Sequence, residues 1–93
     1  MTRVLLDGYL EVPAEHIEAV AAALPEHIRL TRAEPGCLSF RVEQSAEQPT
    51  HFLVSEVFAD REAFEAHQHR AASSHWAKVT AGMPRHYTVR DEA

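Results

Sequence analysis

Histidine is the residue type in this sequence that most suggests chemistry, because seven of the 93 residues are histidines. A neutral imidazole titrates near physiological pH and can accept or donate a proton. His67 follows Phe64 by three residues in a stretch with helical spacing, so both side chains are expected on one face of a helix. We therefore take His67 as the first candidate for a catalytic base. The alternative is a half-buried histidine that interacts with the end of its helix.

His75 and Trp76 begin another stretch with helical spacing. Trp76 shares one face with Val79 and Met83, which favours a place in the core over a wall against which a flat substrate stacks. The side chain of His75 points about 100° away from Trp76 around the helix axis. His75 is therefore a second candidate base, either at the rim of a pocket or facing solvent.

Glu56 is the one charged residue on an otherwise apolar strand face within residues 52–58. A buried carboxyl group must be paired or have a raised pKa. Glu56 is expected either to orient His67, as a third catalytic residue, or to bond an arginine or a backbone amide. Arg85 is expected either to hold an anionic substrate or to form a salt bridge. The residues expected to bind substrate are Trp76, Phe64, Arg85 and Phe52.

The other histidines do not form a metal-ligand set. His67 and His69 are two residues apart, which places their rings about 200° apart on a helix, and no HxxxH or HExxH motif occurs. His16 and His27 are expected on helix surfaces, and His51 at a hairpin edge or on the sheet face that has no helices. We expect no bound metal.

Composition excludes several classes of protein. The net charge of -5 argues against nucleic-acid binding, and the single cysteine excludes an intramolecular disulfide. No apolar run approaches the ~18 residues of a membrane span, and the N-terminus lacks the features of a signal peptide. We therefore expect one cytoplasmic domain over residues 1–93, without a membrane partner.

Alternating apolar residues predict strands over residues 3–12, 37–45, 51–59 and 85–90. A helix is expected from Pro13. Because proline cannot sit in an undisturbed helix interior, Pro25 is expected to start a second helix that ends near residue 33. Pro35 and Gly36 predict a turn in which Gly36 supplies a positive φ. Helices are also expected after Asp60 and after Ser73 or Ser74, which are suitable N-caps.

This order, β-α-β-β-α-β, is typical of the α+β ferredoxin-like fold, in which helices cover one face of a four-stranded antiparallel sheet. Leu38, Phe40 and Val42 are expected on the covered face. The bare face would still carry apolar residues, and such a patch is most simply covered by a second copy of the chain. We therefore predict a homodimer through the open sheet face. The residues concerned are Leu5, Tyr9, Leu53, Val57 and Ala59.

Three segments resemble the antibiotic biosynthesis monooxygenase (ABM) domain family. The stretch 31–38 (TRAEPGCL) resembles the R-x-E-P-G-C turn of that family. The stretch 52–58 (FLVSEVF), followed by Asp60 and by residues 63–67 (AFEAH), resembles its E-x-W/F-x-D-x-x-A-x-x-x-H segment. The stretch 73–76 (SSHW) resembles its T-P-H-F/Y segment. These segments occur in the family's order and lie within a resemblance that spans residues 4–89.

The resemblance implies a dimeric α+β barrel with a pocket between sheet and helices in each subunit. Members include monooxygenases that oxidise quinols or polyketide-like phenols without a cofactor, haem-degrading monooxygenases, and an isomerase of a phosphorylated ketone. Cofactor-free oxygenation needs a base, donors that hold a phenolate, and a dry pocket. The haem-degrading relatives use an asparagine, which this chain lacks. They also use a tryptophan and a ligand histidine, and here His67 and Ala77 stand at about those positions.

The resemblance and the histidines together predict a cofactor-independent monooxygenase acting on a quinol or polyketide-like aromatic, with His67 or His75 as base. Two alternatives remain open. One is an isomerase of a small phosphorylated ketone, and the other is a non-catalytic dimeric module that binds a small molecule or serves a stress response.

Overall fold

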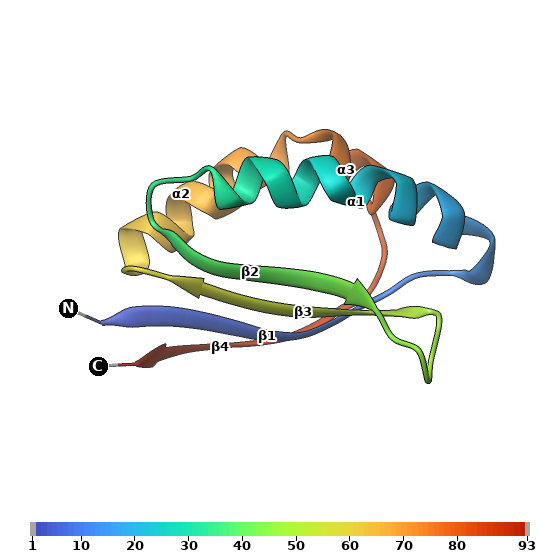
Figure 1. Cartoon of the computed structure of the whole chain (residues 1–93), viewed down its shortest axis with the longest axis horizontal. Helices are drawn as coiled ribbons and strands as arrows, with labels where there is room; N and C mark the ends of the chain where they lie inside the picture. The colour runs from blue at the N-terminus through green and yellow to red at the C-terminus, as the bar shows by residue number, and fades with distance from the viewer. Residues whose placement is uncertain (1, 93) are drawn as a thin grey trace.

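The protein folds into a four-stranded sheet with all its helices on one face, as Figure 1 shows for the computed structural model, which describes residues 2–92. The sheet is antiparallel throughout, with strand order β2-β3-β1-β4. This arrangement confirms the predicted α+β ferredoxin-like fold. In chain order the elements are β1 (Arg3–Glu11), a 3-10 turn (Ala14–His16), α1 (Ile17–Arg32), β2 (Cys37–Gln44), β3 (His51–Phe58), α2 (Arg61–Ala72), α3 (His75–Val79) and β4 (Arg85–Glu92).

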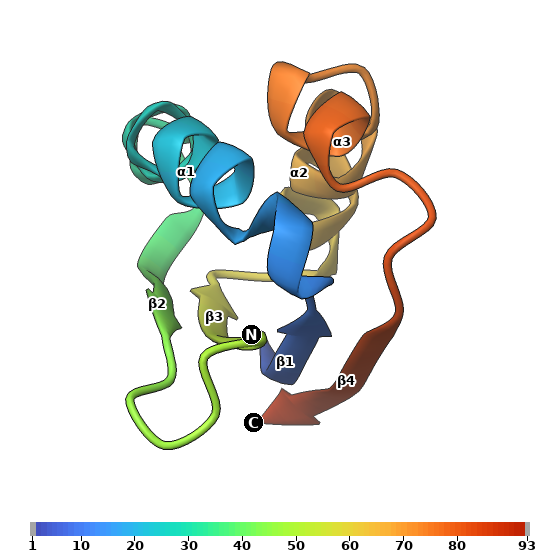
Figure 2. The same cartoon turned by 90° about the vertical axis from the view of Figure 1, so that its right-hand side faces the viewer.

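The core lies between the two layers seen end-on in Figure 2. In strands β1 and β3 buried side chains alternate with outward-facing ones, because successive residues of a strand point to opposite faces. The single domain predicted over residues 1–93 includes Met1 and Ala93, which lie outside the described residues. The largest fully buried apolar side chains are Val4, Leu10, Val12, Val20, Phe40, Phe52 and Phe58.

One continuous helix replaces the two that Pro25 was expected to separate. Helix α1 runs through Pro25, so the predicted break is wrong. Its buried residues Val20, Ala23, His27 and Thr31 form one stripe that crosses the proline, while Pro25 itself is exposed on the opposite side. Burying this stripe against the sheet outweighs the one backbone hydrogen bond that a proline removes.

Leu38 also departs from expectation. It is 55% exposed, whereas Phe40 and Val42 are buried as predicted. The cause is a β-bulge between Cys37 and Ser39, which puts one extra residue into β2 opposite β3. A bulge shifts the alternation of a strand by one residue, so Leu38 leaves the covered face.

Two glycines allow backbones to approach closely. Gly36 does not have the positive φ predicted for it. Instead, a Cβ at Gly36 would lie 2.2 Å from the Cβ of Ala63, so a glycine is needed where the turn before β2 rests on α2. Gly8 in β1 has φ of 151°, and a Cβ there would lie 1.9 Å from the backbone oxygen of His86 in β4.

The N-cap of α2 is Asp60, as the sequence predicted, and that of α3 is Ser74, one of its two candidates. The side chain of Asp60 accepts a hydrogen bond from the backbone N–H of Ala63 at 2.8 Å, and Ser74 accepts one from Ala77 at 3.2 Å. Side-chain oxygens at these positions satisfy backbone donors that a helix start leaves free. The caps fix where the two helices begin, and therefore which of their residues face the sheet.

The sheet face opposite the helices carries a mixture of apolar, aromatic and charged residues. Leu53 is 43% exposed there, and Tyr9 lies flat between His51 and His86, with ring centroids 4.1 and 4.5 Å apart. His51 thus lies on the helix-free face, as predicted. Within residues 2–92, the structure has no helix of the length and apolar character that crossing a membrane requires.

Candidate functional site

A cavity of about 260 Å³ opens between the sheet and the three helices. Helix α1 contributes His27, α2 contributes His67, and α3 contributes Trp76 to its wall. The sheet contributes Glu56 from β3 together with residues of β1 and β4. Its lining residues are Leu6, His27, Glu56, His67, Gln68, Ala71, Ala72, Trp76, Ala77, Arg85 and Tyr87.

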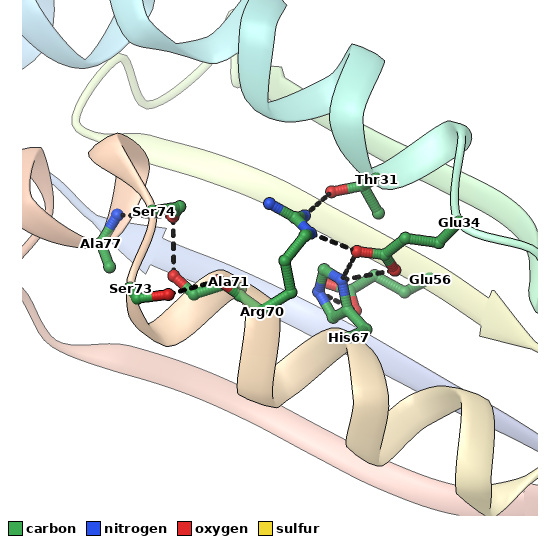
Figure 3. A network of polar contacts seen from close by, with 9 residues as sticks. All are labelled: Thr31, Glu34, Glu56, His67, Arg70, Ala71, Ser73, Ser74 and Ala77. Atoms are coloured by element: carbon green, nitrogen blue, oxygen red, sulfur yellow. Dashed lines mark hydrogen bonds and ion pairs between the residues drawn. The ribbon is translucent and has the colours of Figure 1, made fainter.

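His67 is held in place by a carboxylate that is itself anchored (Figure 3). The Nδ1 of His67 lies 3.0 and 3.2 Å from the two carboxylate oxygens of Glu34, in the turn after α1. Arg70, one turn further along α2, donates to Glu34 from Nε and to the hydroxyl of buried Thr31 at 3.0 Å from Nη2. Because an ionised carboxylate only accepts hydrogen bonds, Nδ1 carries the proton and Nε2 is left with its lone pair.

Glu56 approaches the other side of the His67 ring without bonding it. Its Oε1 lies 3.8 Å from His67 Nε2, which is beyond hydrogen-bond distance, and is buried without a partner among the described residues. Burial raises the pKa of Glu56 to about 7, and the negative charge of Glu34 adds to the effect. Burial lowers the pKa of His67, and the hydrogen bond and charge of Glu34 oppose that shift. Glu56 therefore gains and loses its proton near neutral pH, whereas the lowered pKa of His67 favours its neutral form there.

The prediction that His27 lies on a helix surface is wrong, because its side chain is only 6% exposed. Its ring lies parallel to that of Trp76, with centroids 4.7 Å apart and an interplanar angle of 4°. Burial, with the nearby charges of His67, Arg70 and Arg85, lowers the pKa of His27 to about 4. The sequence pattern missed His27 because Pro25 seemed to interrupt the stripe to which it belongs.

Arg85 and Tyr87 reach the cavity from the last strand. The guanidinium of Arg85 donates to the backbone oxygens of Thr80 and Met83 and, at 2.6 Å, to the hydroxyl of Thr80. Among the described residues no carboxylate pairs with Arg85, which also lines the cavity. Burial raises the pKa of Tyr87 to about 12, which keeps its phenol protonated.

The structure brings together four of the seven residues singled out from the sequence, namely His67, Glu56, Trp76 and Arg85. His75 is exposed and does not line this cavity. Phe52 is 1% exposed and Phe64 9% exposed, and both belong to the hydrophobic core rather than to the cavity wall.

Glu34 and Arg70 were not singled out as site residues. Glu34 belongs to the turn that carries the family resemblance, and Arg70 follows His67 by three residues on the same face of α2. The spacing of Arg70 was visible in the sequence, but the contact between Glu34 and His67 joins residues 33 apart and appears only in the fold. Within residues 2–92 no three histidine, cysteine or acidic side chains gather where they could hold a metal ion.

The comparisons with known proteins place this geometry in a family. The sequence profile described as "Antibiotic biosynthesis monooxygenase" (ABM) matches residues 3–79. This match covers more than half of the chain and includes both Glu34 and His67. The chain therefore belongs to the ABM family, as its sequence segments had indicated. The comparison with curated proteins gave no significant match.

Solved structures agree with this assignment. A protein from Nitrosomonas europaea that is assigned as an antibiotic biosynthesis monooxygenase is 27% identical, with a TM-score of 0.81, covering 96% of this chain and 88% of its own. The protein PA3566 from Pseudomonas aeruginosa is 23% identical, with a TM-score of 0.75 and coverages of 98% and 92%. The protein Rv0793 from Mycobacterium tuberculosis is 24% identical, with a TM-score of 0.74 and coverages of 97% and 93%. The last two share the fold.

Proposed function

We propose that this ABM protein is a monooxygenase that oxidises a quinol or polyketide-like aromatic with O₂, with His67 as the base and without a bound cofactor. One observation carries the proposal. Glu34 fixes His67 through Nδ1, so that Nε2 is turned toward Glu56 in a cavity walled by Trp76. A histidine held on one side and free on the other is the arrangement that general-base chemistry requires.

The reaction divides into steps that these residues can serve. Nε2 of His67 takes the proton of a phenolic hydroxyl, and the resulting anion transfers an electron to O₂. The substrate radical and superoxide then combine through a new carbon–oxygen bond. The peroxide then takes back the proton held by His67 and becomes a hydroperoxide. The C–H bond at the same carbon breaks together with the O–O bond, so that this carbon becomes a carbonyl, and the distal oxygen takes the released proton and leaves as water. A quinol and O₂ thus give a hydroxyquinone and water.

Glu56 and Arg85 suit the charge that develops in this reaction. A carboxyl group with a pKa of about 7 is substantially protonated at neutral pH, so Glu56 can donate a hydrogen bond to the phenolate oxygen that forms beside His67. Arg85 provides a positive charge on the same cavity wall. The flat Trp76 ring suits contact with an aromatic substrate, and a substrate bound there excludes water from the site.

The test is oxygen uptake with a panel of quinols and naphthols. We expect His67→Ala to lower kcat by at least about 100-fold, the contribution typical of a general base. His69→Ala is the matched control, because it removes an exposed histidine of the same helix. His75→Ala in the same assay decides whether the exposed second candidate takes part. Turnover equal in wild type and His67→Ala would contradict the proposal, and binding without turnover would favour a non-catalytic module.

A second candidate function is favoured by the proximity of His67 and Glu56. A carboxyl group with a pKa of about 7 and a neutral imidazole that lie 3.8 Å apart could remove a proton from carbon beside a ketone and return it to a neighbouring carbon. This is the chemistry of an isomerase of a small phosphorylated ketone, with Arg85 facing the phosphate. Such a reaction would incorporate solvent deuterium without consuming oxygen, so the two assays separate the candidates.

We also propose that two copies associate through the open sheet face. Leu53 is 43% exposed at its centre, Leu5 and Val57 are half-buried beside it, and their register places all three on the helix-free side. A domain of this size gains stability by covering such a surface. The cavity lies on the other side of the sheet and stays open to a small molecule.

A further inference from the structure

We propose that His27 is a substrate-binding residue that selects aromatics with a second oxygen, on the side of the ring away from the His67 pair. The inference rests on the proposed function and concerns the same cavity. It assigns a role to a buried polar group that the base chemistry leaves unused.

Packing, not hydrogen bonding, holds the His27 ring. One face lies flat on Trp76, and Phe40 meets the ring at an interplanar angle of 79°, with centroids 5.3 Å apart. The side chain is 6% exposed and lines the cavity. Its Nδ1 is fully buried without a hydrogen-bond partner among the described residues, so Nε2 is the ring nitrogen that is left for a ligand in the cavity. Native proteins leave few buried polar side chains without a hydrogen bond. A ligand oxygen bonded to Nε2 would provide one.

The protonation state of His27 indicates which ligand group it accepts. With its pKa lowered to about 4, the imidazole is uncharged at physiological pH and offers one donor and one acceptor. Such a ring pairs with a neutral hydroxyl or carbonyl rather than with a carboxylate or phosphate. Arg85, which lowers the pKa of His27 by its charge, already provides the cationic position in this cavity.

His27 and His67 can then each bond a different oxygen of one flat ligand. The ring centroids of His27 and His67 are 6.3 Å apart, and both residues line the same cavity. An oxygen bonded to His67 Nε2 therefore leaves His27 for another oxygen of the ligand. A quinol supplies both oxygens, whereas a simple phenol or naphthol supplies one and leaves His27 without a hydrogen bond.

Fluorescence of Trp76 provides a direct binding assay, because it is the only tryptophan in the chain and touches His27. The probes are 1,4-dihydroxynaphthalene and 1-naphthol, titrated without oxygen into the full chain. We expect wild type to bind the diol about tenfold more tightly, the effect of one neutral hydrogen bond. His27→Phe keeps an aromatic ring against Trp76 and should bind both compounds equally. His27→Gln, whose amide reaches about as far along the side chain as Nε2, should recover part of the preference.

Each outcome bears on the proposal. Circular dichroism and thermal unfolding establish first that the variants are folded. A wild type without preference, or a His27→Phe protein that keeps it, would overturn the role of His27. An equal loss of affinity for both compounds would mean that the ring only packs. If wild type prefers the diol but does not oxidise it aerobically, the monooxygenase proposal fails while the role of His27 stands.

Discussion

Among single residues, two carboxyl groups lie on opposite sides of the His67 ring. Glu34 bonds Nδ1 and is anchored by Arg70, whereas Glu56 lies opposite Nε2 without a bond. The two carboxyl groups therefore act differently although both are near one imidazole. Glu34 fixes the ring and its tautomer, whereas burial raises the pKa of Glu56 to about 7, so that Glu56 gains and loses its proton near neutral pH.

Replacing Glu34 tests the first of these roles. We expect Glu34→Gln to lower kcat by about 10- to 100-fold with little change in KM, because a neutral amide holds the His67 ring less firmly in its orientation. Since the Glu34 carboxylate raises the pKa of His67, its loss should also move the acidic limb of the kcat/KM profile to lower pH. Glu65→Gln, at an exposed position of α2, is the control. An unshifted profile would contradict the role.

Replacing Glu56 tests the second role through stability. The folded protein holds the Glu56 proton up to a pKa of about 7, whereas the unfolded chain loses it near 4.5. Wild type therefore binds more protons when folded in this window and loses stability as pH rises through it. We expect the free energy of unfolding of Glu56→Gln, measured relative to wild type, to rise by on the order of 3 kcal/mol between pH 4.5 and pH 7.5. Urea unfolding at both pH values measures this difference, and a constant difference would contradict the shift.

The sequence identified His67, Glu56, Trp76 and Arg85 because each is an unusual residue type at a readable position in a strand or helix. It could not identify how they are partnered. The bond between Glu34 and His67, and the flat stacking of His27 on Trp76, each join residues more than 30 positions apart. Only packing of the helices on the sheet determines such contacts.

Among the elements, helix α1 forms because its apolar stripe is buried, although the local preference of proline disfavours a helix there. Proline disfavours a helix interior, and this preference predicted a break in α1 that does not occur. The apolar stripe of α1 continues across Pro25, and its burial determines the helix. Caps were predictable for the opposite reason, since Asp60 and Ser74 act on backbone groups within three residues.

The turn before β2 positions Glu34, so its packing on α2 should influence activity. In Gly36→Ala the new methyl would meet Ala63, and the turn must move away from α2, loosening the Glu34–His67 contact. We expect about 1–3 kcal/mol of destabilisation, typical of overpacking, and a fall in kcat. The double variant Gly36→Ala with Ala63→Gly restores the space and should recover kcat. Unchanged kcat in the single variant would show that the turn does not position Glu34.

At the scale of the whole molecule, the sheet separates the cavity on its helix side from the helix-free face. Alternation along β1 and β3 was enough to predict that one face is covered by helices and that the other still carries apolar residues, which lie there among polar ones. The bulge at Leu38 was not predictable, because an extra residue in a strand leaves no mark on the alternation until the partner strand is known.

The proposed dimer can be tested on the open face. We expect Leu53→Asp to shift the protein from dimer to monomer at micromolar concentration in sedimentation velocity, because a buried unpaired charge is strongly unfavourable at an interface. Val89→Asp is the matched control, since Val89 is similarly exposed, at 42%, but pairs with Leu6 on the helix side. A wild type that sediments as a monomer would contradict the interface.

Gly8 has a consequence for the breadth of the cavity. Any side chain at that position would push against the backbone of His86 and force β4 away from β1. Both β1, through Leu6, and β4, through Arg85 and Tyr87, line the cavity. By allowing the two strands to lie close together, Gly8 sets the distance between these lining residues, although it does not line the cavity itself. A larger residue at position 8, where β1 pairs with β4, is therefore a way to widen the cavity for a larger ligand.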